Sequence, residues 1–190
     1  MRDQTPLDPR RAALVFYDMT QNRFTKGERR YLRAAVDGLP EIVRLVASSR
    51  AAGVPICYVV SARAAPDFDI CHAIAPQPGE KLVIHTKTGG FFGTDLEQFL
   101  GEQGRDSLIL SGIALDYGVS STAREALTLG IHPILLRDAC FSYDIPSSPV
   151  GTVTREDLER AHLASLHFMG AGIMSIGEVI SALTHATSAT

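Results

Sequence analysis

Acidic and basic residues follow two of the apolar runs that the sequence marks as strands. Asp18 comes directly after the run AALVFY, and His85 and Lys87 lie at and just beyond the end of the run that begins at Lys81. Because the carboxyl ends of parallel strands meet at one edge of a sheet, we expect these groups to lie close together. A carboxylate beside a cation in a partly buried cleft can act as a general acid–base pair, since each group shifts the proton affinity of the other. A structural salt bridge is the alternative, and the pattern favours neither.

The stretch LILSGIALDYGVSSTAREALTLG, residues 108 to 130, predicts a strand, a tight turn and a helix in close succession. The start of such a helix points free backbone N–H groups at the edge of the sheet. Gly118 is therefore a candidate donor to an anion or a developing oxyanion. Every crossover of a parallel sheet contains such a junction, so this pattern alone does not assign a function.

The segment from residue 61 to 80 is rich in proline and acidic residues and predicts a long loop. Loops of this length in a compact domain are often functional. Arg63, Asp67, Asp69 and His72 could contact a substrate from here. The alternative for each is that an exposed loop charge is simply solvated.

Apolar runs predict six strands, and amphipathic runs between them predict helices. Their alternation has no internal repeat and predicts an α/β fold with one domain over residues 1–190. We expect a doubly wound, six-stranded, mainly parallel sheet flanked by helices in three layers. The expected strands are 12–17, 54–60, 81–85, 108–110, 131–136 and 172–175; the expected helices are 32–52, one starting near 94, 119–129, 154–169 and 176–183, with a frayed tail after them.

Composition limits the kind of partner. The chain has 190 residues, of which 45% are hydrophobic and 21% charged, and its formal net charge is −3. A nucleic-acid-binding protein would carry a basic footprint, so we expect a small polar or anionic molecule as partner and no nucleic acid. The charged N-terminus lacks a signal-peptide pattern, and no segment is apolar enough to span a bilayer. These features predict a cytoplasmic location and no membrane partner.

The three cysteines, Cys57, Cys71 and Cys140, show neither CxxC nor Cys/His spacing. We therefore expect no disulfide framework and no structural zinc site. Cys57 lies inside an apolar run and is expected in the core. Cys71 and Cys140 fall in predicted loops and stay candidates for a reactive thiol.

Three segments of the chain resemble motifs of the isochorismatase-like hydrolases, a family within the cysteine hydrolase superfamily. They are ALVFYDMTQNRF, PQPGEKLVIHTKTGGFFGTDL and SGIALDYGVSSTAREALTLGIHPILLRDAC, in the family's order and spacing, and the similarity runs from Asp8 to about Leu183. The resemblance implies the doubly wound fold, hydrolysis of a small molecule at the strand edge without a cofactor, and a homo-oligomer. It also implies an Asp–Lys–Cys triad, which most members carry.

The match places the triad aspartate at Asp18 and the cysteine position at Gly118, which has no side chain that can attack a substrate. Relatives with glycine there hydrolyse a vinyl ether without a covalent intermediate. The position of the lysine stays open. An ungapped match puts His85 there, whereas a shift of two residues keeps the same strand face and brings in Lys87. We favour Lys87 slightly, with His85 as its neighbour or substitute.

The resemblance also implies a cis peptide at Ile113–Ala114, so that the backbone N–H groups of Ala114 and Gly118 face the substrate. Phe24, Arg63 and Phe91 are expected to contact that substrate.

One branch of the family, the nicotinamidases, binds a metal through an Asp-x-His pair. Asp69 and His72 have a different spacing, so we predict no metal site.

Three functions are compatible with these patterns. The favoured one is a hydrolase of a small polar molecule, in which Asp18 is the general acid or base, Lys87 or His85 holds its charge state, and water fills the space of the absent thiol. The second is a degenerate member that binds a metabolite or a partner without turnover. The third is an amidohydrolase that uses Cys140 or Cys71.

Overall fold

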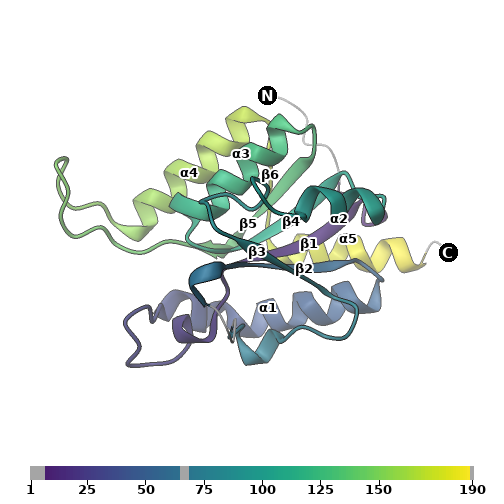
Figure 1. Cartoon of the computed structure of the whole chain (residues 1–190), viewed down its shortest axis with the longest axis horizontal. Coiled ribbons are helices and arrows are strands. Elements are labelled where there is room, and N and C mark those ends of the chain that lie inside the picture. Colours follow the sequence, from purple (N-terminus) through teal and green to yellow (C-terminus); the bar gives the residue numbers. More distant parts are fainter. Residues whose placement is uncertain (1–6, 65–68, 189–190) are drawn as a thin grey trace.

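The computed structural model describes residues 7–64 and 69–188. Six strands form one parallel sheet in the order β3-β2-β1-β4-β5-β6 (Figure 1), which confirms the predicted α/β fold. The strands are β1 (Ala12–Tyr17), β2 (Ile56–Ser61), β3 (Lys81–His85), β4 (Ser107–Ile113), β5 (His132–Phe141) and β6 (Gly172–Met174).

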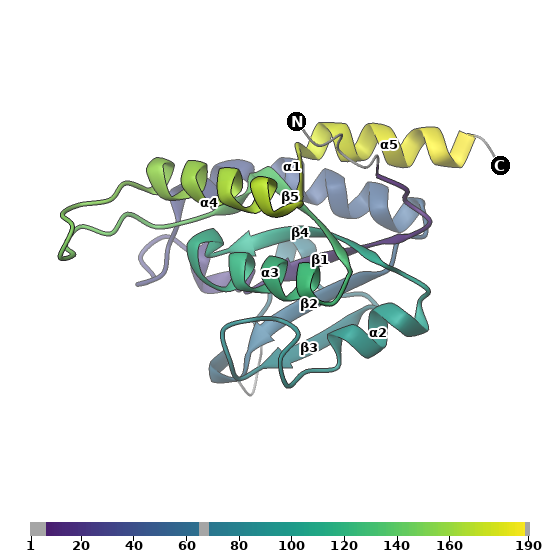
Figure 2. The same cartoon turned by 90° about the horizontal axis from the view of Figure 1, so that it is seen from above.

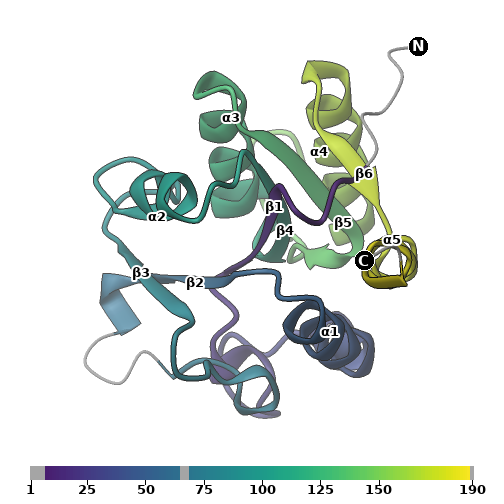
Figure 3. The ribbon, with the colours of Figure 1, turned by 90° about the vertical axis from the view of Figure 1, so that its right-hand side faces the viewer.

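Helices cover both faces of this sheet, as Figure 3 shows. On one side lie α1 (Arg33–Ala51) and α5 (Ile176–Ser188); on the other lie α2 (Leu96–Glu102), α3 (Ser120–Thr128) and α4 (Arg155–Met169). Central strand β1 is buried along its whole length, with Phe16 packed on the α1 side and Tyr17 on the α3 side. This explains why its sequence is apolar without alternation. Within the described residues, no helix is both long and apolar enough to cross a membrane.

The order of the strands places a crevice between β1 and β4. The chain adds β2 and β3 on one side of β1 and then returns to place β4 on the other side. Connections therefore leave the carboxyl ends of β1 and β4 in opposite directions, which opens the position where such sheets bind ligands. Figure 2 shows the same sheet from above, with the segment between β5 and α4 extending away from it.

The turn after β4 and the end of the chain differ from the predicted elements. The turn is one turn of π-helix, Leu115–Val119, that runs directly into α3. The last helix, α5, continues to Ser188, where the sequence analysis expected a frayed tail.

Strand β5 is also longer than expected. It was predicted to end before Arg137 and Asp138, but it continues to Phe141, so Cys140 lies in a strand and not in a loop. A register shift against β4 accommodates the two charged, exposed residues, after which the side chains are buried again. An irregularity of this kind bends a strand without ending it.

Candidate active site

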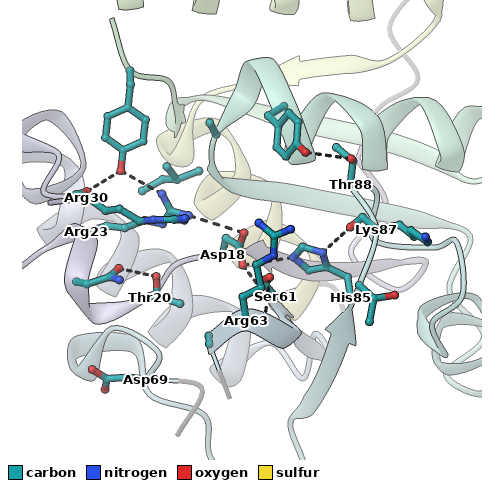
Figure 4. Close-up of a pocket in the computed structure, with 17 residues that line it drawn as sticks. Asp18, Thr20, Arg23, Arg30, Ser61, Arg63, Asp69, His85, Lys87 and Thr88 are labelled. Carbon is teal, nitrogen blue, oxygen red and sulfur yellow. Dashed lines mark hydrogen bonds and ion pairs between the residues drawn. The ribbon is translucent and has the colours of Figure 1, made fainter. Parts of the chain in front are cut away.

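A cavity of about 750 Å³ opens at the carboxyl edge of the sheet (Figure 4). The described residues that line it come from the ends of β1 to β4 and from the segments that follow β1 to β5. They are Asp18, Thr20, Asn22, Arg23, Arg30, Ser61, Arg63, Ala64, Asp69, His85, Thr86, Lys87, Thr88, Ile113, Ala114, Tyr117 and Tyr143.

Asp18 stands at the end of β1 with its carboxylate facing this cavity. Its backbone has a φ of 50°, a left-handed conformation that aspartate tolerates better than most side chains. The backbone N–H of Ser61, at the end of β2, donates to Asp18 Oδ1 over 2.9 Å. Only 14% of the side chain is exposed. The carboxylate is therefore held in place by two neighbouring strands.

His85, the last residue of β3, is the ring that meets Asp18. Its Nε2 lies 3.4 Å from Asp18 Oδ1, and its Nδ1 lies 2.6 Å from the carbonyl oxygen of Lys87. Burial alone would lower the pKa of His85, but the hydrogen bond and charge of Asp18, together with the Lys87 carbonyl, raise that pKa above the ordinary 6.5. The site thus favours protonation of this histidine more than water does.

These contacts determine how many protons the Asp18 and His85 side chains share. A carbonyl oxygen can only accept, so the contact with Lys87 requires a hydrogen on His85 Nδ1. If Asp18 is ionised, Nε2 must also carry a hydrogen to face it; if Nε2 is bare, Asp18 must be protonated. When the pair holds its proton, that proton therefore lies between His85 Nε2 and Asp18.

A buried arginine approaches the other oxygen of the carboxylate. Arg23 Nη2 lies 3.8 Å from Asp18 Oδ2, and Arg23 Nη1 donates to the hydroxyl of Tyr143 over 3.1 Å. That hydroxyl donates to the carbonyl of Arg30. Arg23 Nε is buried and has no hydrogen-bond partner in the described part of the chain. No sequence pattern distinguishes Arg23, because it lies in a polar segment that contains several other charges.

Lys87, which the sequence analysis favoured slightly over His85, lines the cavity but reaches His85 through its backbone carbonyl. Figure 4 shows its side chain directed away from Asp18. The reason is that β3 ends at His85. The chain then turns toward α3, where Gly90 N–H donates to the side chain of Thr122. Side-chain alternation along a strand therefore no longer applies at residue 87.

The turn after β4 packs against the side chain of Tyr17, which no sequence pattern predicts. The peptide Ile113–Ala114 is cis, as expected, and Ala114 lines the cavity. Gly118 is buried and is not among the described lining residues. A Cβ at position 118 would lie 2.1 Å from a ring carbon of Tyr17. The expected water position beside Gly118 is thus occupied by an aromatic ring.

The remaining residues singled out in the sequence fall into two groups. Arg63 and Asp69 line the cavity, whereas Phe24 and Phe91 pack against the hydrophobic core instead. Apolar rings gain free energy when they leave water, which explains this placement. Asp67 lies outside the described residues, and His72 is exposed and contacts Asp69. In residues 7–64 and 69–188 no group of three or more His, Cys, Asp or Glu side chains is arranged to hold a metal ion.

All three cysteines are buried, and none is among the described lining residues. Cys140 Sγ donates to the carbonyl of Leu110, and burial raises the pKa of its thiol to about 12. Burial also raises the pKa of Cys57 and of Cys71. A thiol with a raised pKa in a dry environment is a poor nucleophile.

Comparison with known proteins identifies the family. A sequence model of the isochorismatase domain matches residues 12–178. Phenazine biosynthesis protein PhzD of Pseudomonas fluorescens is 33% identical over 156 residues, which cover 72% of this chain and 74% of that protein. The crystal structure of a cysteine hydrolase from Pseudomonas syringae pv. phaseolicola 1448A superposes with a TM-score of 0.90 at 24% identity, over 96% of this chain and 97% of the other. An isochorismatase from Pseudomonas putida KT2440 superposes with a TM-score of 0.83 at 22% identity, over 93% of each chain. The chain belongs to the isochorismatase-like hydrolase family.

Proposed function

We propose that this protein hydrolyses a small anionic molecule by proton transfer from the Asp18–His85 pair, without a covalent enzyme intermediate. The observation that carries the proposal is the contact between His85 Nε2 and Asp18 Oδ1 on the wall of a cavity of about 750 Å³, and the hydrogen that the Lys87 carbonyl requires on His85 Nδ1 supports a proton shared by the pair. A positioned proton donor of this kind typically accelerates a reaction by about 10²–10⁴-fold.

The charge of the cavity favours an anionic substrate. Four cationic side chains line it, Arg23, Arg30, Arg63 and Lys87, against two carboxylates, Asp18 and Asp69, in the described part of the chain. Arginine forms two parallel hydrogen bonds to carboxylate or phosphate groups. A substrate with one or more such groups would offset this positive charge and be held with its reacting bond near Asp18.

Hydrolysis of an enol ether fits this arrangement. The proton of the pair moves to the terminal vinyl carbon, and the π electrons of the double bond form the new C–H bond. Water then adds to the resulting oxocarbenium carbon and returns one proton to the pair. The hemiketal hydroxyl then loses its proton as the bond to the leaving oxygen breaks, and the leaving oxygen takes up a proton, which yields a ketone and an alcohol. None of these steps needs a nucleophilic side chain, which agrees with the glycine at position 118.

Two alternative functions are tested by the same experiment. A chain that binds a metabolite without turnover would have the same cavity and the same charges. An amidohydrolase that uses a relocated cysteine would need a thiol at the cavity, and the burial of Cys71 and Cys140 argues against it.

Turnover and binding should be measured together on a panel of anionic enol ethers, isochorismate among them, and of amides. We expect hydrolysis of an anionic enol ether that persists after the thiols are alkylated. Binding by calorimetry with no product on any substrate would favour the binding protein. Amide cleavage abolished by alkylation would favour the cysteine mechanism and would overturn the proposal.

A further inference from the structure

The side chain of Tyr17 occupies the place beside the turn where a side chain at position 118 would have to stand. A Cβ built on Gly118 would meet ring carbons of Tyr17 at 2.1 and 2.2 Å and its hydroxyl oxygen at 2.5 Å. Real Cβ atoms do not approach other heavy atoms this closely, so Gly118 and Tyr17 are sterically matched. The ring is also buried, with 1% of Tyr17 exposed. The space beside Gly118 is therefore filled by an aromatic ring.

The same ring packs against the histidine of the site. The rings of Tyr17 and His85 are stacked, with centroids 4.8 Å apart and an interplanar angle of 29°. Such contacts restrict the rotation of a side chain in addition to burying it. His85 is thus held from one side by Tyr17 while its Nε2 faces Asp18.

The hydroxyl of Tyr17 adds a second contact. It donates to the carbonyl oxygen of Thr88 over 2.5 Å, and the hydroxyl oxygen lies 3.4 Å from His85 Nδ1. The Thr88 carbonyl directly follows the Lys87 carbonyl that accepts from His85 Nδ1. Burial, followed by the charge of Asp18, raises the pKa of Tyr17, so the hydroxyl keeps its proton at all ordinary pH values. Tyr17 therefore fixes the main chain that orients the imidazole.

From this geometry we propose that Tyr17 is a positioning residue that replaces a nucleophilic side chain at the turn. Its ring fills the space beside Gly118, and its hydroxyl holds the 87–88 main chain so that His85 presents Nε2 to Asp18. Tyr17 is not among the described residues that line the cavity, so it acts through His85 and not on the substrate. The role in catalysis rests on the proposed function, whereas the effect on His85 can be measured without a substrate.

The first test is the titration of His85, followed by NMR, in the wild type and in Tyr17→Phe. The variant keeps the ring and loses the oxygen near Nδ1 and the tie to Thr88. Because that tie holds the main chain whose Lys87 carbonyl faces Nδ1 and raises the pKa of His85, we expect the midpoint of His85 to fall by about 0.5 pH unit, the size of one weak hydrogen bond. An unchanged midpoint would overturn the positioning role.

Tyr58→Phe is the matched control for this titration. Tyr58 is equally buried, on β2, and its hydroxyl donates to the carbonyl of Ile74, outside the cavity. Its removal should leave the His85 midpoint where it is in the wild type. An equal shift in both variants would mean that the effect is general loosening of the sheet, which would also overturn the proposal.

The second test adds a single methyl group beside the ring. We expect Gly118→Ala to lower Tm and to shift the His85 titration, because the new Cβ displaces Tyr17. Gly101→Ala is the control, since a Cβ on that glycine of α2 meets no atom within 4 Å. If Gly118→Ala matches the wild type in both Tm and the His85 midpoint, the ring does not occupy this space and the inference is wrong.

A double variant separates this clash from other damage. Tyr17→Ala together with Gly118→Ala should lower Tm by less than the sum of the two single changes, because the methyl group enters space that the ring has left. Additive losses of Tm would contradict the steric match.

Activity measurements distinguish failure of this inference from failure of the proposed function. If an anionic enol ether is hydrolysed, Tyr17→Phe should lower kcat about tenfold and leave KM unchanged, since misplacement of an acid reduces the rate of the chemical step. If no substrate is hydrolysed, the proposed function fails, while the titration of His85 still decides the role of Tyr17. If kcat depends on Asp18 and His85 but is unchanged in Tyr17→Phe, only the catalytic part of the inference is overturned.

Discussion

His85 makes the charge next to Asp18 dependent on pH, which a lysine at the same place would not do near neutrality. The sequence offered both His85 and Lys87, and no residue pattern decides between them. The decision comes from the main chain, which leaves the strand after His85 and turns Lys87 aside. Tyr17 was missed for a related reason, because a tyrosine inside an apolar run is indistinguishable from an ordinary core residue.

The activity should therefore decrease at alkaline pH. The Asp18–His85 pair can donate a proton only while it holds one, and the pKa of His85 is raised above 6.5. We expect kcat to be constant at lower pH and to decrease as pH rises through that raised pKa. His85→Lys, if active, should extend the plateau to higher pH. If kcat of the wild type and kcat of His85→Lys decrease over the same alkaline pH range, another group controls that decrease.

The pair should also make stability depend on pH. A histidine whose pKa is raised on folding contributes stability that is fully present below its unfolded pKa, about 6.5, and is lost as pH rises through the higher folded value. Urea unfolding at a series of pH values should show this loss in the wild type. In His85→Gln the free energy of unfolding should not decrease over that pH range. If the decrease persists in this variant, other groups cause it.

Arg63 is expected to bind the anionic group of the substrate. It lines the cavity and stands two residues beyond β2. Arg63→Gln should raise KM about 10–100-fold, the effect of losing one hydrogen bond to a charged group, with little change in kcat. Arg160→Gln is the control, because Arg160 is an exposed residue of α4 whose guanidinium pairs with Asp157. An unchanged KM in Arg63→Gln would exclude this contact.

The elements that carry the site were largely predictable, whereas their irregularities were not. Strands β1 and β3 have the predicted bounds because an apolar run and a polar end mark them in the sequence. The π-helical turn after β4 and the register shift in β5 depend on packing between elements. Charged residues inside β5 resemble a strand end, and only the burial of the residues that follow them shows otherwise.

The irregular part of β5 also supports the start of α5. The Asp138 carboxylate accepts from the backbone N–H of Ile176, at 3.0 and 3.1 Å from its two oxygens. Asp138→Ala should therefore lower the free energy of unfolding by about 1 kcal/mol, the usual loss for a helix cap, and leave kcat unchanged. Asp138→Asn keeps one acceptor oxygen and should lose less in the same urea titration. Equal stability of the alanine variant and the wild type would contradict this capping role.

At the scale of the whole molecule, the strand order brings residues distant in sequence to one edge. Asp18 and Ala114 directly follow β1 and β4, and His85 is the last residue of β3. The three residues line one cavity because the sheet winds in two directions from its centre. Strand and helix alternation predicts such a sheet, and with it the side on which the site lies. The expected homo-oligomer stays a prediction, which sedimentation of the purified protein would test.

In the proposed function, the proton shared by Asp18 and His85 performs the reaction. The most direct measurement is kcat of Asp18→Asn on the best anionic substrate, beside Asp37→Asn, an exposed carboxylate of α1 that pairs with Arg33. We expect Asp18→Asn to lose about 10²–10⁴-fold in kcat while it still binds the substrate, and Asp37→Asn to match the wild type. Full activity of folded Asp18→Asn would contradict the mechanism.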